Sequence, residues 1–174
     1  YEVPIFAIDV PMQQNEDNVQ YVADQLRKLK DFIEECTGKK MKDEALTERL
    51  RRSKRTLEKF AQYEKKSADR YIPADLVTPL YAGMTNNLLL GTEEEEMYVD
   101  QLLNGVKNAP AKKGKKIYWM HTIPFWSEAV KNELCFQEKA QIVGCELSRV
   151  CEPDFDPEKP YEAMARRMVY HALN

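Results

Sequence analysis

Two short apolar runs, each followed at once by polar side chains, hold the residues of this sequence best suited to chemistry. Residues 117–120 lead into a histidine and a threonine, and residues 142–144 lead into a cysteine and a glutamate. A helix-like pattern lies between the runs, so a parallel strand-helix-strand unit is the simplest interpretation. Such units bind ligands beyond the carboxyl ends of their strands. The residues predicted to lie on that rim are His121, Thr122, Cys145 and Glu146.

Position at a strand end does not by itself give these residues a role. The imidazole of His121 could carry a proton, because its intrinsic pKa lies near neutrality. The alternative is a partly exposed histidine that hydrogen-bonds a turn, and Glu146 carries the same two alternatives. We therefore assign no catalytic residue and treat His121, Thr122 and Glu146 as candidates for a substrate pocket. The first turn of a helix after Thr122 could also hold an anion through its free N–H groups.

The four cysteines form no recognisable metal motif. The best available set of zinc ligands is His121, Cys135, Cys145 and Cys151, and its intervals match no compact zinc motif. Without a CxxC pair or a signal peptide, reduced thiols in a cytoplasm are expected. No glycine-rich phosphate loop follows either apolar run, so a classical dinucleotide or nucleoside triphosphate site is not expected.

Composition excludes several classes of protein. The 174 residues have a net charge of -3, with 43% hydrophobic and 32% charged residues, which is ordinary for a globular protein. No apolar run approaches the roughly 20 residues that cross a bilayer, so a membrane protein is not expected. There is no overall positive field to recruit nucleic acid. The local cluster from Lys112 to Lys116 is better explained as a solvated linker than as a phosphate-binding patch.

Hydrophobic periodicity predicts mainly helices. The expected elements are a strand over residues 3–11, helices over 19–36, 43–66, 73–89 and 92–106, the strand-helix-strand unit with its helix beginning at Thr122, and a last helix over 161–173. Gly38 is expected to cap the first helix in the left-handed conformation. Thr92 and Glu95 form a capping box in front of another helix.

The clearest boundary is residues 108–116, where Pro110 and Gly114 stand among small and basic residues. We expect an α/β fold with helices dominant: a helix-rich segment over residues 1–110, then the start of a Rossmann-like parallel sheet over 111–174. The predicted strand at the first residues has no preceding partner. It suggests an internal piece of a longer polypeptide.

Several segments together resemble subunits of a known enzyme family. They are Pro4–Pro11, Tyr21–Leu26, Glu35–Lys40, Ile72–Ala74, and the strand at Ile117 followed by Ile142–Glu146. In this order they are similar to the 2-hydroxyacyl-CoA dehydratases, which include 2-hydroxyglutaryl-CoA dehydratase, and to the related benzoyl-CoA reductases. The resemblance covers essentially the whole chain.

The resemblance implies an anaerobic, oxygen-sensitive heterodimer in which each subunit has two Rossmann-like halves and a [4Fe-4S] cluster. A separate ATP-hydrolysing activator supplies one electron, and a ketyl-radical mechanism removes water from a 2-hydroxyacyl-CoA. The cysteines that ligate the cluster are then expected before Val3 and beyond the last helix, outside this chain. Residues 1–110 would end the first half-domain and connect it to the second, which would start within 111–174. The chain alone is expected to bind no cluster and to be inactive.

Two alternatives stay open at this point. The nearest is a benzoyl-CoA reductase-type subunit on the same scaffold. The other is a non-catalytic helical module that docks a partner subunit or the activator through the charged helix from Asp43 to Lys66. The dehydratase interpretation implies three partners, namely a second dehydratase subunit, the ATP-dependent activator protein and the acyl-CoA substrate, with no nucleic acid and no membrane.

Overall fold

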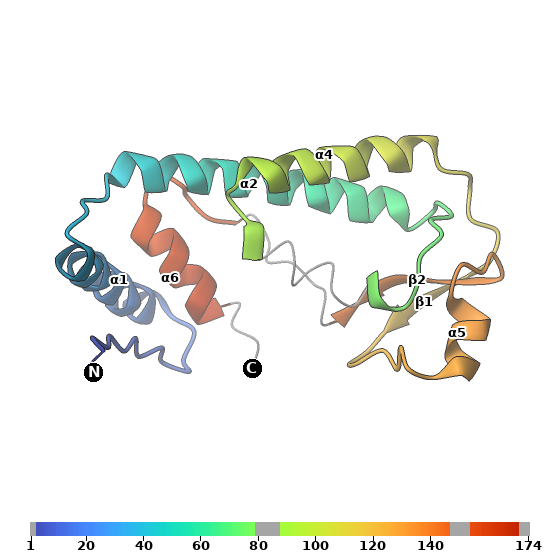
Figure 1. Cartoon of the computed structure of the whole chain (residues 1–174), viewed down its shortest axis with the longest axis horizontal. Helices are drawn as coiled ribbons and strands as arrows, with labels where there is room; N and C mark the ends of the chain where they lie inside the picture. Colours follow the sequence, from blue (N-terminus) through green and yellow to red (C-terminus); the bar gives the residue numbers. More distant parts are fainter. Residues whose placement is uncertain (1–2, 79–87, 147–153, 171–174) are drawn as a thin grey trace. The chain divides into compact units, whose positions relative to one another are not determined.

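The computed structural model describes residues 3–78, 88–146 and 154–170 and is mostly helical, with one small parallel sheet (Figure 1). The elements in chain order are α1 (Glu16–Thr37), α2 (Asp43–Ser67), α4 (Glu93–Asn108), β1 (Lys115–Trp119), α5 (Glu128–Leu134), β2 (Ala140–Cys145) and α6 (Pro160–Tyr170). The expected α/β class with helices dominant is confirmed. Within the described ranges, no helix has both the length and the apolar character needed to cross a bilayer.

The chain divides into two compact units, one formed by Tyr1–Arg51 with Asp154–Asn174 and the other by Arg52–Pro153. These two units do not test the division predicted between residues 110 and 111, which stays a prediction.

Helix α1 of the first unit is capped at both ends, and of the two caps only the one at Gly38 is predicted from the sequence. The side chain of Asn15 accepts a hydrogen bond from the backbone N–H of Asn18 at 2.8 Å. At the other end Gly38 adopts φ 67° and donates its N–H to the carbonyl of Glu34 at 2.9 Å. Both caps satisfy backbone groups that a helix end otherwise leaves unpaired, so the predicted cap at Gly38 is confirmed.

The core of the first unit forms where α1 packs against α6. Its buried members are Val19, Val22, Ala23, Leu26, Tyr161, Ala165 and Val169. Ion pairs between the helices flank this core: Arg27 pairs with Glu162 at 2.5 Å, and Arg166 pairs with Glu16 at 2.5 Å. The apolar stripe of α1 is thus buried at Val19, Val22 and Leu26, whereas Ile33 and Cys36 near the end of the helix are exposed.

The strand expected over residues 3–11 is wrong, because the described residues of that segment belong to no sheet. The backbone of Asp9 forms its hydrogen bonds with the side chain of Gln25 and not with a neighbouring strand. The N–H of Asp9 donates to the Gln25 side-chain oxygen at 2.8 Å, and the Gln25 amide donates to the Asp9 carbonyl at 2.8 Å. Ile8 and Val10 pack against the α1 and α6 core. Extended, apolar residues therefore lie along a helix here, where their pattern suggested a sheet.

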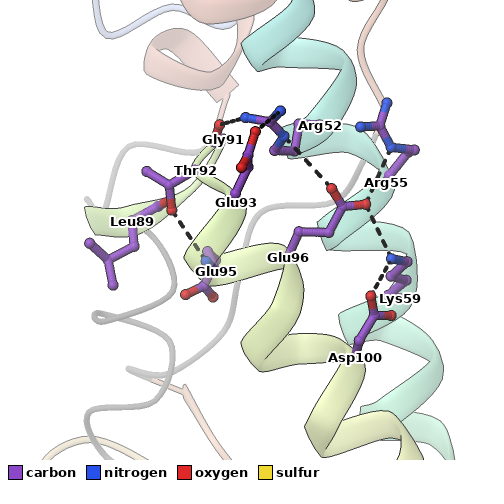
Figure 2. Close-up of polar contacts among 10 residues, drawn as sticks. All are labelled: Arg52, Arg55, Lys59, Leu89, Gly91, Thr92, Glu93, Glu95, Glu96 and Asp100. Atoms are coloured by element: carbon purple, nitrogen blue, oxygen red, sulfur yellow. Dashed lines mark hydrogen bonds and ion pairs between the residues drawn. The ribbon is translucent and has the colours of Figure 1, made fainter.

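In the second unit α4 lies beside the part of α2 from Arg52 onward, and the two helices run in the same direction (Figure 2). Arg52 pairs with Glu93 at 3.0 Å, and further along both helices Lys59 pairs with Asp100 at 2.8 Å. Between them Glu96 accepts hydrogen bonds from Arg55 at 3.3 Å and from Lys59 at 3.1 Å. We call these pairs the α2–α4 ladder. Because partners advance together along both helices, the ladder fixes their register.

Two neighbouring glutamates in the first turn of α4 have opposite environments (Figure 2). Thr92 caps the helix by accepting the N–H of Glu95 at 3.2 Å, as predicted. The Glu95 side chain is buried, and burial raises the pKa of its carboxyl. Burial also raises the pKa of Glu96, but the hydrogen bonds from Arg55 and Lys59 outweigh it, so the pKa of Glu96 is lowered. The α2–α4 ladder therefore stabilises the ionised form of Glu96, whereas burial makes the ionised form of Glu95 unfavourable.

Strands β1 and β2 pair in parallel, with Lys115 opposite Ala140 and Trp119 opposite Cys145. Gly114 allows the chains to meet at the start of this pair. A Cβ atom there would lie 2.0 Å from the carbonyl oxygen of Glu138, and the next residue donates its N–H to the Lys139 carbonyl at 2.9 Å. The predicted parallel strand-helix-strand unit is confirmed.

The helix of this unit begins later than predicted. Thr122 is not its N-cap: α5 begins at Glu128, after Ser127. Ile123 is fully buried, and the N–H of Phe125 turns back onto its carbonyl at 2.8 Å. Because Ile123 inserts into the core and Pro124 follows it, the chain makes a turn before it can become helical.

The helix expected over residues 73–89 also departs from its prediction. Residues 71–75 are not helical, and Asp75 caps a start at Val77 by accepting the N–H groups of Val77 at 3.0 Å and of Thr78 at 2.7 Å. The backbone before it instead bonds the sheet region, since the Gln141 side chain donates to the Ile72 carbonyl at 3.0 Å. Leu80 and Met84 of the expected helix lie outside the described residues.

Replacement of Gly114 by alanine is expected to lower the free energy of unfolding by about 2 kcal/mol, because the added Cβ would overlap backbone atoms. Gly105 in α4 is the matched control, since nothing lies within 4 Å of the point where a Cβ would stand. Its replacement by alanine should stabilise the helix by roughly 0.5 to 1 kcal/mol. Urea unfolding of both variants measures the difference, and equal effects would contradict the close approach at Gly114.

Glu95→Gln should raise the free energy of unfolding at pH 7, because it removes a buried carboxyl whose folded pKa is raised. That gain should vanish as pH falls below the ordinary value of 4.5, where the carboxyl is protonated in both states. Glu96→Gln should lower the free energy by about 1 kcal/mol at pH 7. The destabilisation caused by Glu96→Gln should persist at pH 4.5 and diminish only at lower pH, because the lowered pKa keeps the Glu96 carboxylate ionised until then.

Urea unfolding of the two variants at pH 7 and pH 4 measures both effects. Glu94→Gln is the control, since Glu94 is exposed and has no ion pair among the described residues. Destabilisation by Glu95→Gln at pH 7 would contradict the burial of that carboxyl.

Candidate functional site

The carboxyl ends of β1 and β2 meet at one edge of the sheet, which brings His121 and Glu146 together. These residues are 25 positions apart in the sequence, yet the Glu146 carboxylate accepts a hydrogen bond from the backbone N–H of His121 at 3.1 Å. Thr122 follows directly, and its carbonyl accepts the indole N–H of Trp119 at 3.2 Å. The structure thus gathers the three predicted pocket candidates on one rim.

The backbone at His121 is in the left-handed region, with φ 64°. A non-glycine residue held there costs on the order of 1 to 3 kcal/mol, so neighbouring groups must hold it. Besides the bond from its N–H to Glu146, its carbonyl accepts the thiol of Cys145 at 3.7 Å. Both peptide groups of His121 are therefore held by the end of β2, and we call residues 119–122 with these partners the His121 turn.

Gly144 allows β2 to reach this turn in the observed register. The pairing shifts by one residue between Ile117 and Tyr118, which places Gly144 opposite Tyr118. A Cβ on Gly144 would lie 3.0 Å from the Tyr118 ring, closer than side chains ordinarily approach. The small residue before Cys145 therefore leaves room for the exposed aromatic ring beside it.

Residues next to the rim in sequence differ sharply in burial. Ile123 and Cys145 belong to a core cluster with Leu76. In contrast, Met120 is 72% exposed and Trp126 is 64% exposed. A rim that combines hydrogen-bonding groups with exposed apolar surface suits a ligand that has both polar and apolar parts.

An apolar groove of about 120 Å³ runs beside β2 as far as Gly144. Its walls include Phe60, Tyr63, Ile72, Ile142 and Val143. Burial raises the pKa of the Tyr63 hydroxyl, which is therefore neutral at physiological pH. The groove comes within two residues of Glu146 along the strand, so it offers apolar lining next to the polar rim.

The cysteines do not gather into a metal centre within the part of the chain that the structure describes. Cys36 is exposed in α1, whereas Cys135 and Cys145 pack among apolar side chains near β2. Cys151, the fourth member of the zinc set considered from the sequence, lies outside the described residues. No three His, Cys, Asp or Glu side chains of the described residues are placed to hold a metal ion. The described residues thus do not fit a zinc ion or an iron–sulfur cluster.

Sequence reasoning found the rim but missed what shapes it. Short apolar runs and the polar residues that follow them indicated His121, Thr122 and Glu146, whereas the left-handed conformation of His121 and the bond from Trp119 do not follow from these runs. Histidine is several-fold enriched among non-glycine residues with positive φ, but such residues are so uncommon that residue type alone does not predict the conformation.

One comparison with known proteins gives a match. The family model described as 2-hydroxyglutaryl-CoA dehydratase, D-component, matches residues 1–173. No curated protein and no solved structure matches the chain significantly.

Thiol labelling should follow the exposure of the three described cysteines. Iodoacetamide is expected to alkylate Cys36 first, Cys135 more slowly and Cys145 only after unfolding in urea, because Cys145 is 2% exposed. Mass spectrometry of peptides from timed reactions measures the order. Labelling of Cys145 as fast as Cys36 in the native protein would contradict the buried thiol behind the His121 turn.

Proposed function

Because this chain belongs to the 2-hydroxyglutaryl-CoA dehydratase D-component family, we propose that it forms part of a dehydratase subunit that removes water from a 2-hydroxyacyl-CoA. The observation that carries this proposal is the family match, which spans residues 1–173 of the 174 in the chain. A component of such an enzyme acts with other components. We infer a second dehydratase subunit and an ATP-dependent activator as its partners, in a cytoplasmic, oxygen-sensitive complex.

The carboxyl edge of the sheet is the proposed border of the acyl-CoA pocket. His121, Thr122 and Glu146 supply its polar groups, and the groove along β2 supplies apolar lining for part of the thioester ligand. The position agrees with the general rule that parallel sheets bind ligands at the carboxyl ends of their strands. No residue of this edge is given a proton-transfer role.

The family's [4Fe-4S] cluster, which supplies one-electron chemistry when bound, is proposed to have its cysteine ligands outside this chain. Support comes from the dispersed described cysteines, two of which pack in the apolar cluster near β2. The residues of this chain would then shape the pocket for the acyl-CoA, while other parts of the polypeptide hold the iron.

The alternative of a docking module has less support from the structure than from the sequence. Its basis was the charged face of the helix from Asp43 to Lys66. Arg52, Arg55 and Lys59 of that helix are engaged by carboxylates of α4 in the same unit. Much of the charge that suggested a docking face therefore stabilises the chain's own helix pair.

The test is activity of the complete dehydratase that contains this chain, purified without oxygen with its second subunit and given activator, ATP and a reductant. Formation of the 2-enoyl-CoA from a 2-hydroxyacyl-CoA is the expected result. Reduction of benzoyl-CoA without dehydration would favour the reductase-type alternative. A colourless, iron-free complex that binds the partner and converts neither substrate would support the docking module.

Iron content provides a separate test of where the cluster ligands lie. Serine replacements of Cys36 and Cys135 are expected to leave the iron bound per subunit unchanged, because among the described residues neither thiol belongs to a group of three side chains placed to hold a metal. Iron analysis and visible absorption of the anaerobic protein measure this. Loss of a cluster in either variant would show that the chain itself supplies a ligand.

A further inference from the structure

His121 has an unusual backbone conformation at the place where a ligand is expected. Among the non-glycine residues that the structure describes, only His121 and Phe136 have positive φ. Gly38 and Gly91 also have positive φ, but glycine adopts this conformation without strain. The conformation also directs the side chain, because changing φ swings Cβ about the backbone. The position of the exposed imidazole therefore depends on whatever holds this turn.

The end of β2 holds it through two neighbouring residues. Glu146 accepts the N–H of His121 at 3.1 Å, and the Cys145 thiol donates to the carbonyl of the same residue at 3.7 Å. Cys145 is itself fixed, since it is buried and pairs with Trp119 in the sheet. Strand pairing thus places Glu146 where its carboxylate can reach the turn.

We propose that Glu146 is a positioning residue, which acts by holding the His121 turn in the conformation that binds the acyl-CoA. This inference rests on the proposed function, and it gives Glu146 a structural role where the sequence left a proton-carrying role open. Oxygen Oε2 of Glu146 accepts a hydrogen bond from the backbone N–H of His121. This bond requires a hydrogen-bond acceptor but no transfer of a proton. The ligand-facing groups are then the His121 imidazole and the surface around Thr122.

Two substitutions of Glu146 distinguish a role in holding the His121 turn from a role in proton transfer. Glu146→Gln keeps a side-chain oxygen that can accept the His121 N–H but cannot act as an acid or a base. Glu146→Ala removes the acceptor. For a holding role, KM for the acyl-CoA should rise by no more than about threefold in the glutamine variant and by about tenfold or more in the alanine variant, as expected for loss of a hydrogen bond to a charged group.

Hydrogen exchange at the His121 amide gives a readout that does not need activity. Exchange should be faster in Glu146→Ala than in the unmodified protein and close to normal in Glu146→Gln. Glu138→Ala is the matched control, because Glu138 is exposed and lies before β2, at the opposite end of the sheet. It should change neither KM nor exchange at His121.

His121→Gly tests what the turn presents. Glycine adopts the same φ without strain, so the fold should be retained while the imidazole is lost. KM should then rise although Glu146 is intact. An unchanged KM would show that the imidazole does not contact the ligand.

The inference is overturned if Glu146→Gln loses as much kcat as Glu146→Ala, which would indicate proton transfer. It is equally overturned if Glu146→Ala leaves both KM and exchange at His121 unchanged. If the unmodified complex converts no acyl-CoA, the proposed function fails separately, and the exchange comparison still decides whether Glu146 holds the turn.

Discussion

Parallel pairing of β1 and β2 is the constraint on which the candidate site depends. It brings the ends of two strands to the same edge, so that residues far apart in sequence, His121 and Glu146, become hydrogen-bond partners. An antiparallel pair would place those ends at opposite edges. Two glycines permit the pairing: Gly114 admits the approach of the chain before β2, and Gly144 faces the ring of Tyr118.

The helix pair of the second unit shows how charge is used in this chain. Exposed ion pairs contribute little, typically below about 1 kcal/mol each, so the outer members of the α2–α4 ladder mainly fix register. Glu96 differs because its side chain is only 20% exposed and three cationic side chains approach it. The charged face of α2, which looks like a solvated or docking surface in the sequence, is thus partly an internal contact (Figure 2).

Features set by local sequence were predictable, and features set by tertiary contacts were not. Caps at Gly38 and Thr92 follow from residue type at a helix end, and the parallel unit follows from two apolar runs with a helix between them. The segment at residues 3–11 is apolar, as a strand would be, but its described residues belong to no sheet. Its partner is the side chain of Gln25, and such pairing leaves no pattern in the sequence. The predicted strand ends likewise located the rim. The helix after β1, however, begins only at Glu128, because Ile123 is buried in the core. The left-handed conformation of His121 depends on contacts from the end of β2.

Whether the carboxyl edge of the parallel pair faces the acyl-CoA is tested most directly by hydrogen–deuterium exchange of the complete dehydratase, with and without a non-reactive acyl-CoA analogue. We predict slower exchange in peptides covering residues 117–124 and 142–146 when the analogue binds. Binding that leaves both peptides unchanged and protects other parts of the chain would contradict the proposed position of the pocket.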